Sequence, residues 1–458
     1  MQAEEVRQTP EARYISGRAV VRVTHLTARG AAVGHVQQWL ALPAASDWAA
    51  VFGAHAMDAA PPEQCEFVGG LPGELLEVEL QWPTLRPGRR RARRAPGPRL
   101  SVQRILQPSP DRVEPLCPVF GLCGGCQLQH LAYEQQLAWK ANRVATLLRD
   151  AGVVAPAIAP PIACDEPWHY RNHMRFSVDR EGRAGLTPHA SRRVIPLAQC
   201  PIAHPLINAV LASVRHGAVA RPQLLIRCGA ATDEVLVQPA PDTQLSQRLA
   251  DAGIAVHTDA VHERLPVPTA QGKHLAADTE PVTFRVRPSS FFQTNTAQAA
   301  RMAQAVLAGL PTGPTVSLVD AYCGVGTFAA LLAASVGRVY AVEESASAIQ
   351  DARWNLRGFA NVEVIQAKTE VWLPNFHDRL DGLVIDPPRV GCARPVLDAL
   401  VARRVPYVVY VSCDPATLAR DLAYLCVEAG AYRPITVQPL DMFPQTAHIE
   451  TIVSLEAA

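Results

Sequence analysis

The sequence of 458 residues predicts an α/β protein with a small amino-terminal β-barrel, a central α+β domain and a carboxyl-terminal parallel sheet. After Pro314, hydrophobic runs alternate with helical patterns, which is typical of a parallel sheet covered on both faces. Before residue 105 the chain contains mostly short strand-like runs and loops. Hydrophobic residues make up 48% of the chain and charged residues 19%, so a sizeable core can form.

The amino-terminal part is expected to form the barrel, because its hydrophobic runs are short and are separated by turn residues. The strand-like runs are residues 20–23, 31–35 and 75–80. The middle part begins with a long amphipathic helix and then alternates between short strands and turns, which favours an α+β domain. The predicted domains are residues 1–105, 106–280 and 281–458.

A run of arginines lies near the end of the predicted barrel. Residues 86–99, RPGRRRARRAPGPR, contain seven arginines and no acid, although the formal charge of the whole chain is only +1. Such a run suggests contact with phosphate groups. A solvated loop rich in proline and glycine is an equally good interpretation of this segment alone.

Composition also limits where the protein works. No apolar run reaches the roughly 20 residues that span a bilayer, and the first residues lack the basic-then-apolar order of a signal peptide. We therefore expect a cytoplasmic protein with no membrane partner. The eleven cysteines are an odd number, which argues against a disulfide framework and for metal or catalytic roles.

Three of these cysteines lie close together, in CPVFGLCGGC. Cys117, Cys123 and Cys126 fall within ten residues, and two glycines between the last pair let backbone N–H groups turn toward sulfur. This spacing indicates an iron–sulfur cluster or a zinc ion. A fourth thiolate is needed, for which Cys200 is the candidate and Cys164 the rival.

The carboxyl-terminal part contains five buried-strand patterns, followed by a late hairpin. The five runs are residues 316–319, 339–342, 362–365, 383–385 and 408–411, and the hairpin combines residues 435–437 with 449–455. The first run leads into DAYCGVGTF, whose two glycines allow a tight turn and close approach of a ligand. Glu343 ends the second run, where a carboxylate can accept hydrogen bonds from a ribose. Because Ala329 replaces the third glycine of a dinucleotide fingerprint, S-adenosylmethionine fits better than a pyrophosphate ligand.

A cysteine follows the fifth predicted strand, in YVSCDP. Cys413 would lie at the carboxyl edge of the sheet, where open α/β sheets bind ligands. Pro415 suits the first turn of the next helix, and the start of that helix is expected to lower the pKa of the Cys413 thiol. A small core cysteine is the alternative interpretation. Asp386, in DPPR, ends the fourth strand and would face cofactor or substrate, or else the solvent in a turn.

Taken together, CPVFGLCGGC, FFQTN, DAYCGVGTF, DPPR, VSCDPATLARDL and LDMFPQTAHIET resemble the RNA 5-methyluridine (uracil-5) methyltransferases. The motifs occur in that family's order between Cys117 and Thr451. The resemblance implies a TRAM-like barrel, a central domain with a [4Fe–4S] cluster and a Rossmann-like class I methyltransferase domain. It also implies an RNA partner, 23S ribosomal RNA in the iron–sulfur branch or alternatively transfer RNA, and we expect a monomer.

The resemblance further implies roles for single residues. Cys413 would be the nucleophile that adds to carbon 6 of uracil, and Glu450 would be the base that removes the proton from carbon 5. The implied S-adenosylmethionine contacts are Gln293, Tyr322, Gly324, Thr327, Glu343 and Asp386. The implied cluster ligands are Cys117, Cys123, Cys126 and Cys200. A small-molecule methyltransferase and a non-catalytic RNA-binding protein are the alternatives from other functional classes.

Overall fold

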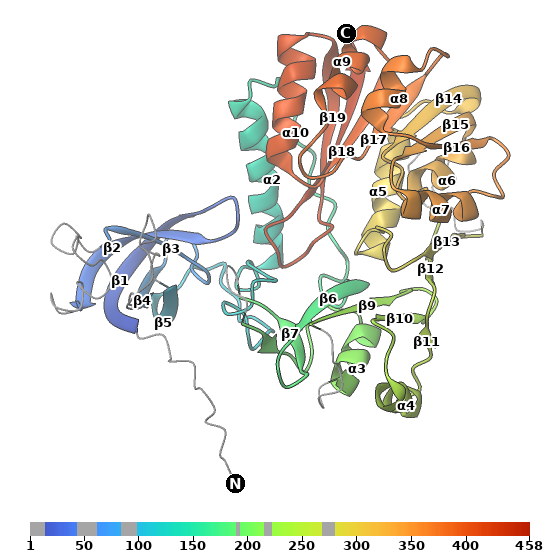
Figure 1. Cartoon of the computed structure of the whole chain (residues 1–458). Helices are drawn as coiled ribbons and strands as arrows, with labels where there is room; N and C mark the ends of the chain where they lie inside the picture. Colours follow the sequence, from blue (N-terminus) through green and yellow to red (C-terminus); the bar gives the residue numbers. More distant parts are fainter. Residues whose placement is uncertain (1–13, 44–61, 84–98, 189–192, 215–221, 268–279) are drawn as a thin grey trace, which may run out of the picture. The chain divides into compact units, whose positions relative to one another are not determined.

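This computed structural model describes residues 14–43, 62–83, 99–188, 193–214, 222–267 and 280–458. The chain divides into two compact units (Figure 1): residues 1–121 with 126–132, and residues 122–125 with 133–458. The predicted division into three domains stays a prediction. Arginines 86–94 lie outside the described residues.

The first unit is an antiparallel sheet with strand order β3-β2-β1-β4-β5. Alternate side chains of β1, among them Ala19, Val21 and Val23, are buried on one face, where they pack with residues of the other strands. The edge strands β3 and β5 come into contact, so the sheet curls on itself as expected of a barrel-like domain. Irregular pairing along β1–β2 and β4–β5 permits this curvature. The strands are β1 (Tyr14–Leu26), β2 (Ala32–Ala41), β3 (Gln64–Phe67), β4 (Leu75–Pro83) and β5 (Arg99–Gln107).

The second unit contains a six-stranded sheet of order β11-β10-β9-β6-β7-β8 and a two-stranded sheet, β12-β13. The alternation predicted for β6 is present, because Met174 and Phe176 are buried and Arg175 between them is exposed. The strands are β6 (His173–Val178), β7 (Ala184–Leu186), β8 (Ile195–Pro196), β9 (Gln223–Cys228), β10 (Val235–Gln238), β11 (Val256–His257), β12 (Val261–Leu265) and β13 (Val282–Val286). The helices here are α3 (Pro205–Val214) and α4 (Thr243–Asp251).

A seven-stranded sheet of order β16-β15-β14-β17-β18-β20-β19 forms the rest of the second unit. The five predicted parallel strands are parallel, and the late hairpin β19–β20 adds antiparallel to β18. The strand order reverses between β14 and β17, which is where α/β sheets of this kind bind ligands. The strands are β14 (Gly313–Ala321), β15 (Val336–Glu343), β16 (Val362–Gln366), β17 (Gly382–Ile385), β18 (Tyr407–Ser412), β19 (Tyr432–Leu440) and β20 (Glu450–Ala457).

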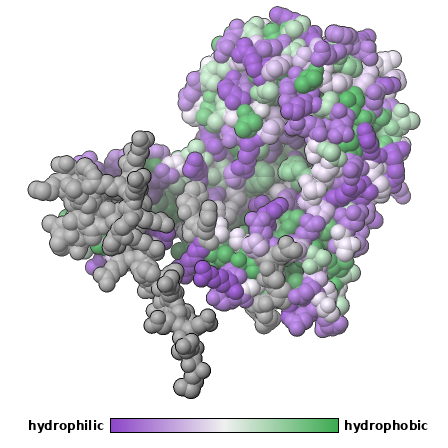
Figure 2. Space-filling view, viewed as in Figure 1, coloured by the Kyte–Doolittle hydropathy of each residue, from purple (hydrophilic) through white to green (hydrophobic). Residues whose placement is uncertain are grey.

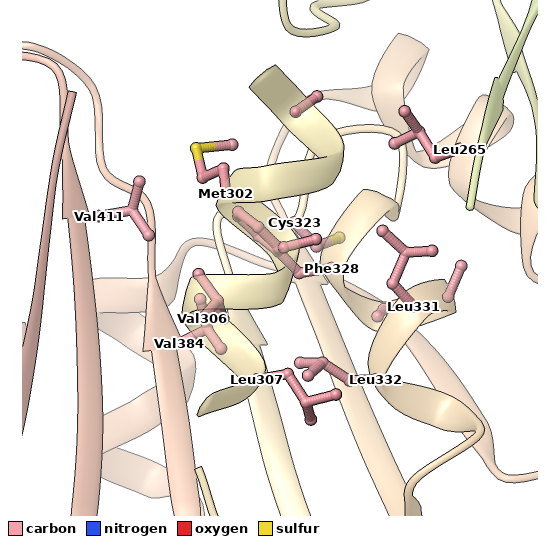
Figure 3. Close-up of a cluster of buried hydrophobic side chains, with 14 of the residues drawn as sticks. Leu265, Met302, Val306, Leu307, Cys323, Phe328, Leu331, Leu332, Val384 and Val411 are labelled. Atoms are coloured by element: carbon pink, nitrogen blue, oxygen red, sulfur yellow. The ribbon is translucent and has the colours of Figure 1, made fainter. Parts of the chain in front are cut away.

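Helices cover both faces of this sheet, as the near-continuous apolar strands require. One face, with Val384 and Val411, packs against α5 and α6 (Figure 3). The opposite face, with Leu383 and Tyr410, packs against α2, α9 and α10. The helices are α2 (Tyr133–Asp150), α5 (Thr296–Ala308), α6 (Thr327–Ala333), α7 (Ala346–Asn355), α8 (Thr369–Asn375), α9 (Arg394–Arg403), α10 (Pro415–Leu422) and the π-helix η2 (Ala423–Glu428).

Among the described residues, no helix is both long enough and apolar enough to cross a bilayer. On the face shown in Figure 2, hydrophobic side chains form scattered patches among hydrophilic ones. In the second unit, two large clusters of apolar side chains are buried between the seven-stranded sheet and the helices that cover it. Each such side chain contributes roughly 1.5–3 kcal/mol on full burial.

Candidate active site

The turn after β14 has the backbone geometry of a ligand-binding loop. Tyr322, Gly324 and Gly326 all have positive φ values, of 63°, 56° and 88°. A Cβ on Gly324 would meet no atom within 4 Å, whereas a Cβ on Gly326 would lie 2.8 Å from Leu356. Gly326 is therefore needed for packing at the start of α6, and the position of Gly324 leaves its outer side open to a ligand. A non-glycine residue at positive φ, such as Tyr322, is typical of functional sites.

Glu343, at the end of β15, holds this turn from the neighbouring strand. Its Oε2 accepts a hydrogen bond from the Gly324 N–H at 3.1 Å, and its Oε1 accepts one from the Ser345 N–H at 2.7 Å. A carboxylate has about four acceptor positions, so Glu343 can still accept hydrogen bonds from a ligand.

A small pocket lies over the turn and encloses about 40 Å³. Five of the six predicted cofactor contacts line it: Gln293, Tyr322, Gly324, Thr327 and Asp386. Tyr322 also borders a second cavity of about 450 Å³, together with Glu370, Pro388 and Val390. Since small-molecule sites usually measure roughly 300–1,000 Å³, an elongated ligand would need space from both cavities.

Three carboxyl groups, those of Asp320, Glu343 and Asp386, lie near one another at this turn. Asp320 is completely buried at the end of β14, and its Oδ2 accepts the Ala329 N–H at 2.8 Å. Burial, together with the nearby Asp386 and Glu343, raises the pKa of Asp320 to about 8. Burial likewise raises the pKa of Asp386 to about 7. This arrangement suits a cationic ligand and disfavours a phosphate group.

Cys413 and Glu450 are brought together by the pairing of β18 with β20. Ser412, the last residue of β18, pairs with Thr451 on β20; Cys413 follows Ser412 just beyond β18, and Glu450 precedes Thr451 as the first residue of β20. Opposing side chains in such pairs have Cβ atoms about 4.5–5.5 Å apart. Because β20 runs antiparallel to β18, it starts at the sheet edge where β18 ends. Cys413 and Glu450, which are 37 positions apart in the sequence, therefore lie at the same edge of the sheet.

The expectation that the helix start lowers the pKa of the Cys413 thiol is wrong. Burial, followed by the charges of Glu450 and Asp386, raises that pKa to about 11 in spite of the nearby Arg389. Asp414 caps α10, and its carboxylate accepts the Ala416 and Thr417 N–H groups itself. A negative cap thus occupies the end of the helix that was expected to stabilise the thiolate.

Glu450 is buried, and its pKa is raised well above the ordinary value by burial and by the nearby Asp386. Arg389 opposes this shift and also favours the charged form of the Cys413 thiol. Sequence reasoning did not select Arg389 as a site residue. The sequence feature that could have identified Arg389 is its position in DPPR, where it follows the predicted site residue Asp386 after two prolines.

The four predicted cluster cysteines are divided between the two units. Cys117 and Cys126 belong to the first unit, and Cys123 and Cys200 to the second. The Gly125 N–H points to the Cys123 sulfur at 3.4 Å, as expected from the glycine pair. Within the described ranges, however, no three His, Cys, Asp or Glu side chains are grouped to hold a metal ion. The structure therefore gives the iron–sulfur prediction no support.

The rival ligand Cys164 has a different environment. Its sulfur accepts a hydrogen bond from Asn295 Nδ2 at 3.3 Å and donates one to the Glu166 carbonyl at 3.2 Å. Asn295 also caps α5, so this buried thiol contributes to local packing at the start of that helix.

The sheet order, the turn after β14 and the thiol beyond β18 are those of an α/β fold of the class that binds ligands at the carboxyl edge of the sheet. The protein family described as tRNA (Uracil-5-)-methyltransferase matches residues 232–458. Two uncharacterized RNA methyltransferases are similar over most of their length. The relative from Thermosynechococcus vestitus is 37% identical over 390 residues, which cover 77% of this chain and 86% of the relative. The relative from Halalkalibacterium halodurans is 35% identical over 398 residues, covering 78% and 86%.

The chain belongs to the RNA uracil-5-methyltransferase family. A solved structure supports the fold: the tRNA (uracil-54, C5)-methyltransferase of Pyrococcus abyssi, in complex with S-adenosyl-L-homocysteine, matches with a TM-score of 0.61. That match has 23% sequence identity and covers 85% of this chain and 94% of the Pyrococcus chain. The predicted α/β methyltransferase fold is thereby confirmed.

Proposed function

We propose that this protein transfers a methyl group from S-adenosylmethionine to carbon 5 of a uridine in RNA, through a transient bond between Cys413 and the uracil ring. The observation that carries the proposal is the pairing of β18 with β20, which sets Cys413 beside Glu450 at the ligand-binding edge. Family membership supports the same reaction.

The proposed donor site consists of Gln293, Tyr322, Gly324, Thr327 and Asp386 around the pocket, with Glu343 behind the turn. When bound, S-adenosylmethionine supplies an electrophilic methyl group on a positively charged sulfur. The carboxyl groups at this turn fit its sulfonium and ammonium charges, and the open side of Gly324 leaves room for it. The S-adenosyl-L-homocysteine in the Pyrococcus abyssi structure, which is the demethylated form of this donor, is consistent with this assignment.

The residues of the chain carry out the remaining steps. The Cys413 thiolate adds to carbon 6, and the electron pair of the C5=C6 bond moves toward the carbonyl at carbon 4. Carbon 5 then forms a bond to the methyl group of the donor, the S–CH3 bond breaks, and its electron pair stays on the sulfur as a neutral thioether. Glu450 removes the proton on carbon 5, the C5=C6 bond reforms, and the C6–S bond breaks to release Cys413. In the ligand-free site, the raised pKa values of Cys413 and Glu450 favour the neutral thiol and the neutral carboxylic acid. The positive charge of the bound donor would favour the thiolate and the carboxylate that the reaction needs.

We propose 23S ribosomal RNA as the substrate, with transfer RNA as the second candidate. The target base must leave its stack to reach the thiol, which costs a few kcal/mol and is easiest in loops. The barrel-like sheet and the arginine-rich segment are the proposed binding surface for the RNA backbone. Binding should then weaken as salt concentration rises.

A transcript that contains 5-fluorouridine tests the central step. Fluorine on carbon 5 cannot be removed as a proton, so the methylated adduct should remain attached to Cys413. We expect a donor-dependent covalent complex with the native enzyme and none with Cys413→Ala. Absence of any such complex, on both ribosomal and transfer RNA, would falsify the proposed reaction.

The alternatives give different results in the same preparation. A non-catalytic RNA-binding protein would bind RNA equally well with Cys413→Ala and would methylate with neither form. A small-molecule methyltransferase would not retain RNA even at low salt.

The [4Fe–4S] cluster on Cys117, Cys123, Cys126 and Cys200 is a separate proposal from the resemblance, and no step above depends on it. Iron and sulfide analysis of protein purified without oxygen tests it. About four iron atoms per chain would support the cluster, and stoichiometric zinc would replace it with a zinc site.

A further inference from the structure

Helix α2 has an unusual buried face. Its buried residues are Gln136, Lys140, Val144 and Leu148, which are spaced by four and so lie along one side of the helix. Val144 and Leu148 pack into the core under the seven-stranded sheet, as an amphipathic helix requires. Gln136 and Lys140 are as fully buried as these apolar residues. Buried polar side chains of this kind need specific partners.

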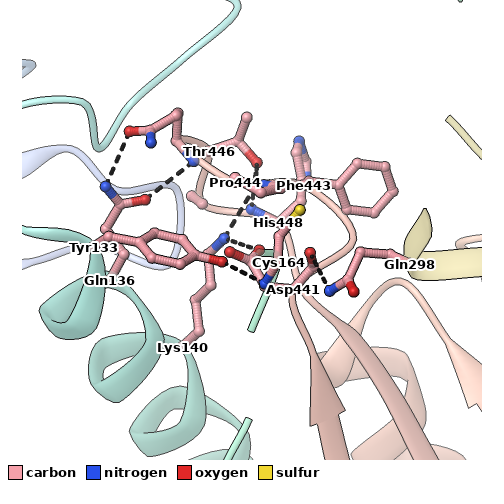
Figure 4. A network of polar contacts seen from close by, with 12 residues as sticks. Tyr133, Gln136, Lys140, Cys164, Gln298, Asp441, Phe443, Pro444, Thr446 and His448 are labelled. Carbon is pink, nitrogen blue, oxygen red and sulfur yellow. Dashed lines mark hydrogen bonds and ion pairs between the residues drawn. The ribbon is translucent and has the colours of Figure 1, made fainter. Parts of the chain in front are cut away.

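The partners lie in the segment 441–449, which connects β19 to β20 and ends immediately before Glu450. Lys140 Nζ donates to Asp441 Oδ1 at 2.6 Å and to the Phe443 carbonyl at 3.1 Å (Figure 4). Both side chains of the Lys140–Asp441 ion pair are completely buried. This pair therefore fixes the start of the segment from a helix about 300 residues earlier in the chain.

Two further residues of α2 hold the same segment. Gln136 and Gln445 exchange two hydrogen bonds: Gln136 Nε2 donates to Gln445 Oε1, and the Gln445 N–H donates to Gln136 Oε1, both at 3.0 Å. Arg143 donates to the Ala447 carbonyl at 3.0 Å. One face of α2 thus binds the segment at alternate residues, 441, 443, 445 and 447.

The backbone of the segment needs this support. Gln445 has a φ of 68°, a left-handed conformation that a residue with a Cβ adopts only where its surroundings enforce it. Other elements satisfy further carbonyls: Tyr170 donates to the Pro444 carbonyl at 3.1 Å, and Gln298 donates to the Asp441 carbonyl at 3.0 Å. The segment has almost no regular structure of its own, so these side chains determine its path.

We propose that α2 is a positioning element for the reaction, with Lys140 as its central residue. By holding segment 441–447, Lys140 and Gln136 fix the path of the chain into Glu450, the first residue of β20. Together with the strand pairing, they thereby set the distance between the Glu450 carboxyl and the uracil ring on Cys413. This inference rests on the proposed function. Proton removal is the step that needs Glu450, whereas formation of the adduct needs Cys413 and the donor. Displacing the segment should slow release of the methylated product more than formation of the adduct.

The test compares two rates in each variant: trapping on 5-fluorouridine RNA, and turnover on ordinary RNA. Trapping by the native enzyme establishes the reaction itself, so only the ratio of the two rates in the variants bears on α2. The main variant is Lys140→Met combined with Asp441→Leu, which removes both buried charges and the hydrogen bond to the Phe443 carbonyl. Gln136→Leu is a milder variant that changes only the contact with Gln445. Arg149→Ala, on the exposed end of the same helix, is the matched control.

We expect the double variant to keep its trapping rate within about twofold while its turnover falls by roughly 10-fold to 100-fold, as for a misplaced catalytic group. Methylated adduct should accumulate on ordinary RNA, as it should with Glu450→Gln. Gln136→Leu should change the ratio in the same direction by a smaller factor, and Arg149→Ala should leave it unchanged. Equal losses of trapping and turnover, or no loss in either, would show that α2 only stabilises the fold.

Discussion

Alkylation of Cys413 by iodoacetamide measures the electrostatics of the ligand-free site directly. The thiolate is the reactive form of cysteine. Since the pKa of Cys413 is raised from 9.0 to about 11, its thiolate population at pH 8 is about 100-fold lower than that of an unperturbed thiol. The rate of alkylation should therefore be slow at pH 8 and rise about tenfold per pH unit up to about pH 11.

The rate is measured at Cys413 alone, by mass spectrometry of the peptide that contains it, because the chain has ten other cysteines. Circular dichroism at each pH checks that the protein stays folded, and Cys413→Ser identifies the labelled peptide by its loss. Arg389→Gln should slow the reaction further at pH 9, because it removes the positive charge that favours the thiolate. A rate that levels off below pH 9 would refute the reasoning, since it would mean that the helix start outweighs burial.

The remaining predictions concern stability. Gly324→Ala should lower the free energy of unfolding by only roughly 1–2 kcal/mol, which is the cost of a left-handed backbone for a residue with a Cβ. Gly326→Ala should lower it by about 1–3 kcal/mol more, because its Cβ would lie 2.8 Å from Leu356. Equal shifts of the two urea unfolding curves would contradict this. Lys140→Met alone should destabilise the second unit by about 3–5 kcal/mol, because it leaves the Asp441 charge buried without its partner. Adding Asp441→Leu should recover most of that loss in the same urea assay, and failure to recover would mean that the carboxylate has other essential contacts.

Much of the fold was predictable because the relevant signals are local. The five apolar runs after Pro314 are near-continuous, as strands covered on both faces must be, and each became a strand of the parallel sheet. The glycines after the first of these strands predicted a turn, and Gly324 and Gly326 have the positive φ values that such a turn needs. These features depend on a few neighbouring residues, so a sequence pattern is sufficient to predict them.

The predicted direction of the Cys413 pKa shift was wrong for a reason that local patterns do not contain. The sequence places a helix start next to the thiol, which by itself favours the thiolate. Burial depends instead on everything packed around the sulfur, and Glu450 arrives from a strand 37 residues further along. The same limitation applies to α2, where the hydrophobic pattern indicates a buried face but does not say that Gln136 and Lys140 belong to it.

The sequence by itself determined the class of fold, the turn after β14 and the positions along the chain where chemistry is expected. Only the tertiary structure decided which of those positions meet. It inserts β20 between β18 and β19, which brings Glu450 to Cys413, and it packs α2 against the segment before Glu450. The physical reason is that periodicity and turn chemistry act over a few residues, whereas burial and ion pairs such as Lys140–Asp441 join residues whose separation in sequence carries no pattern.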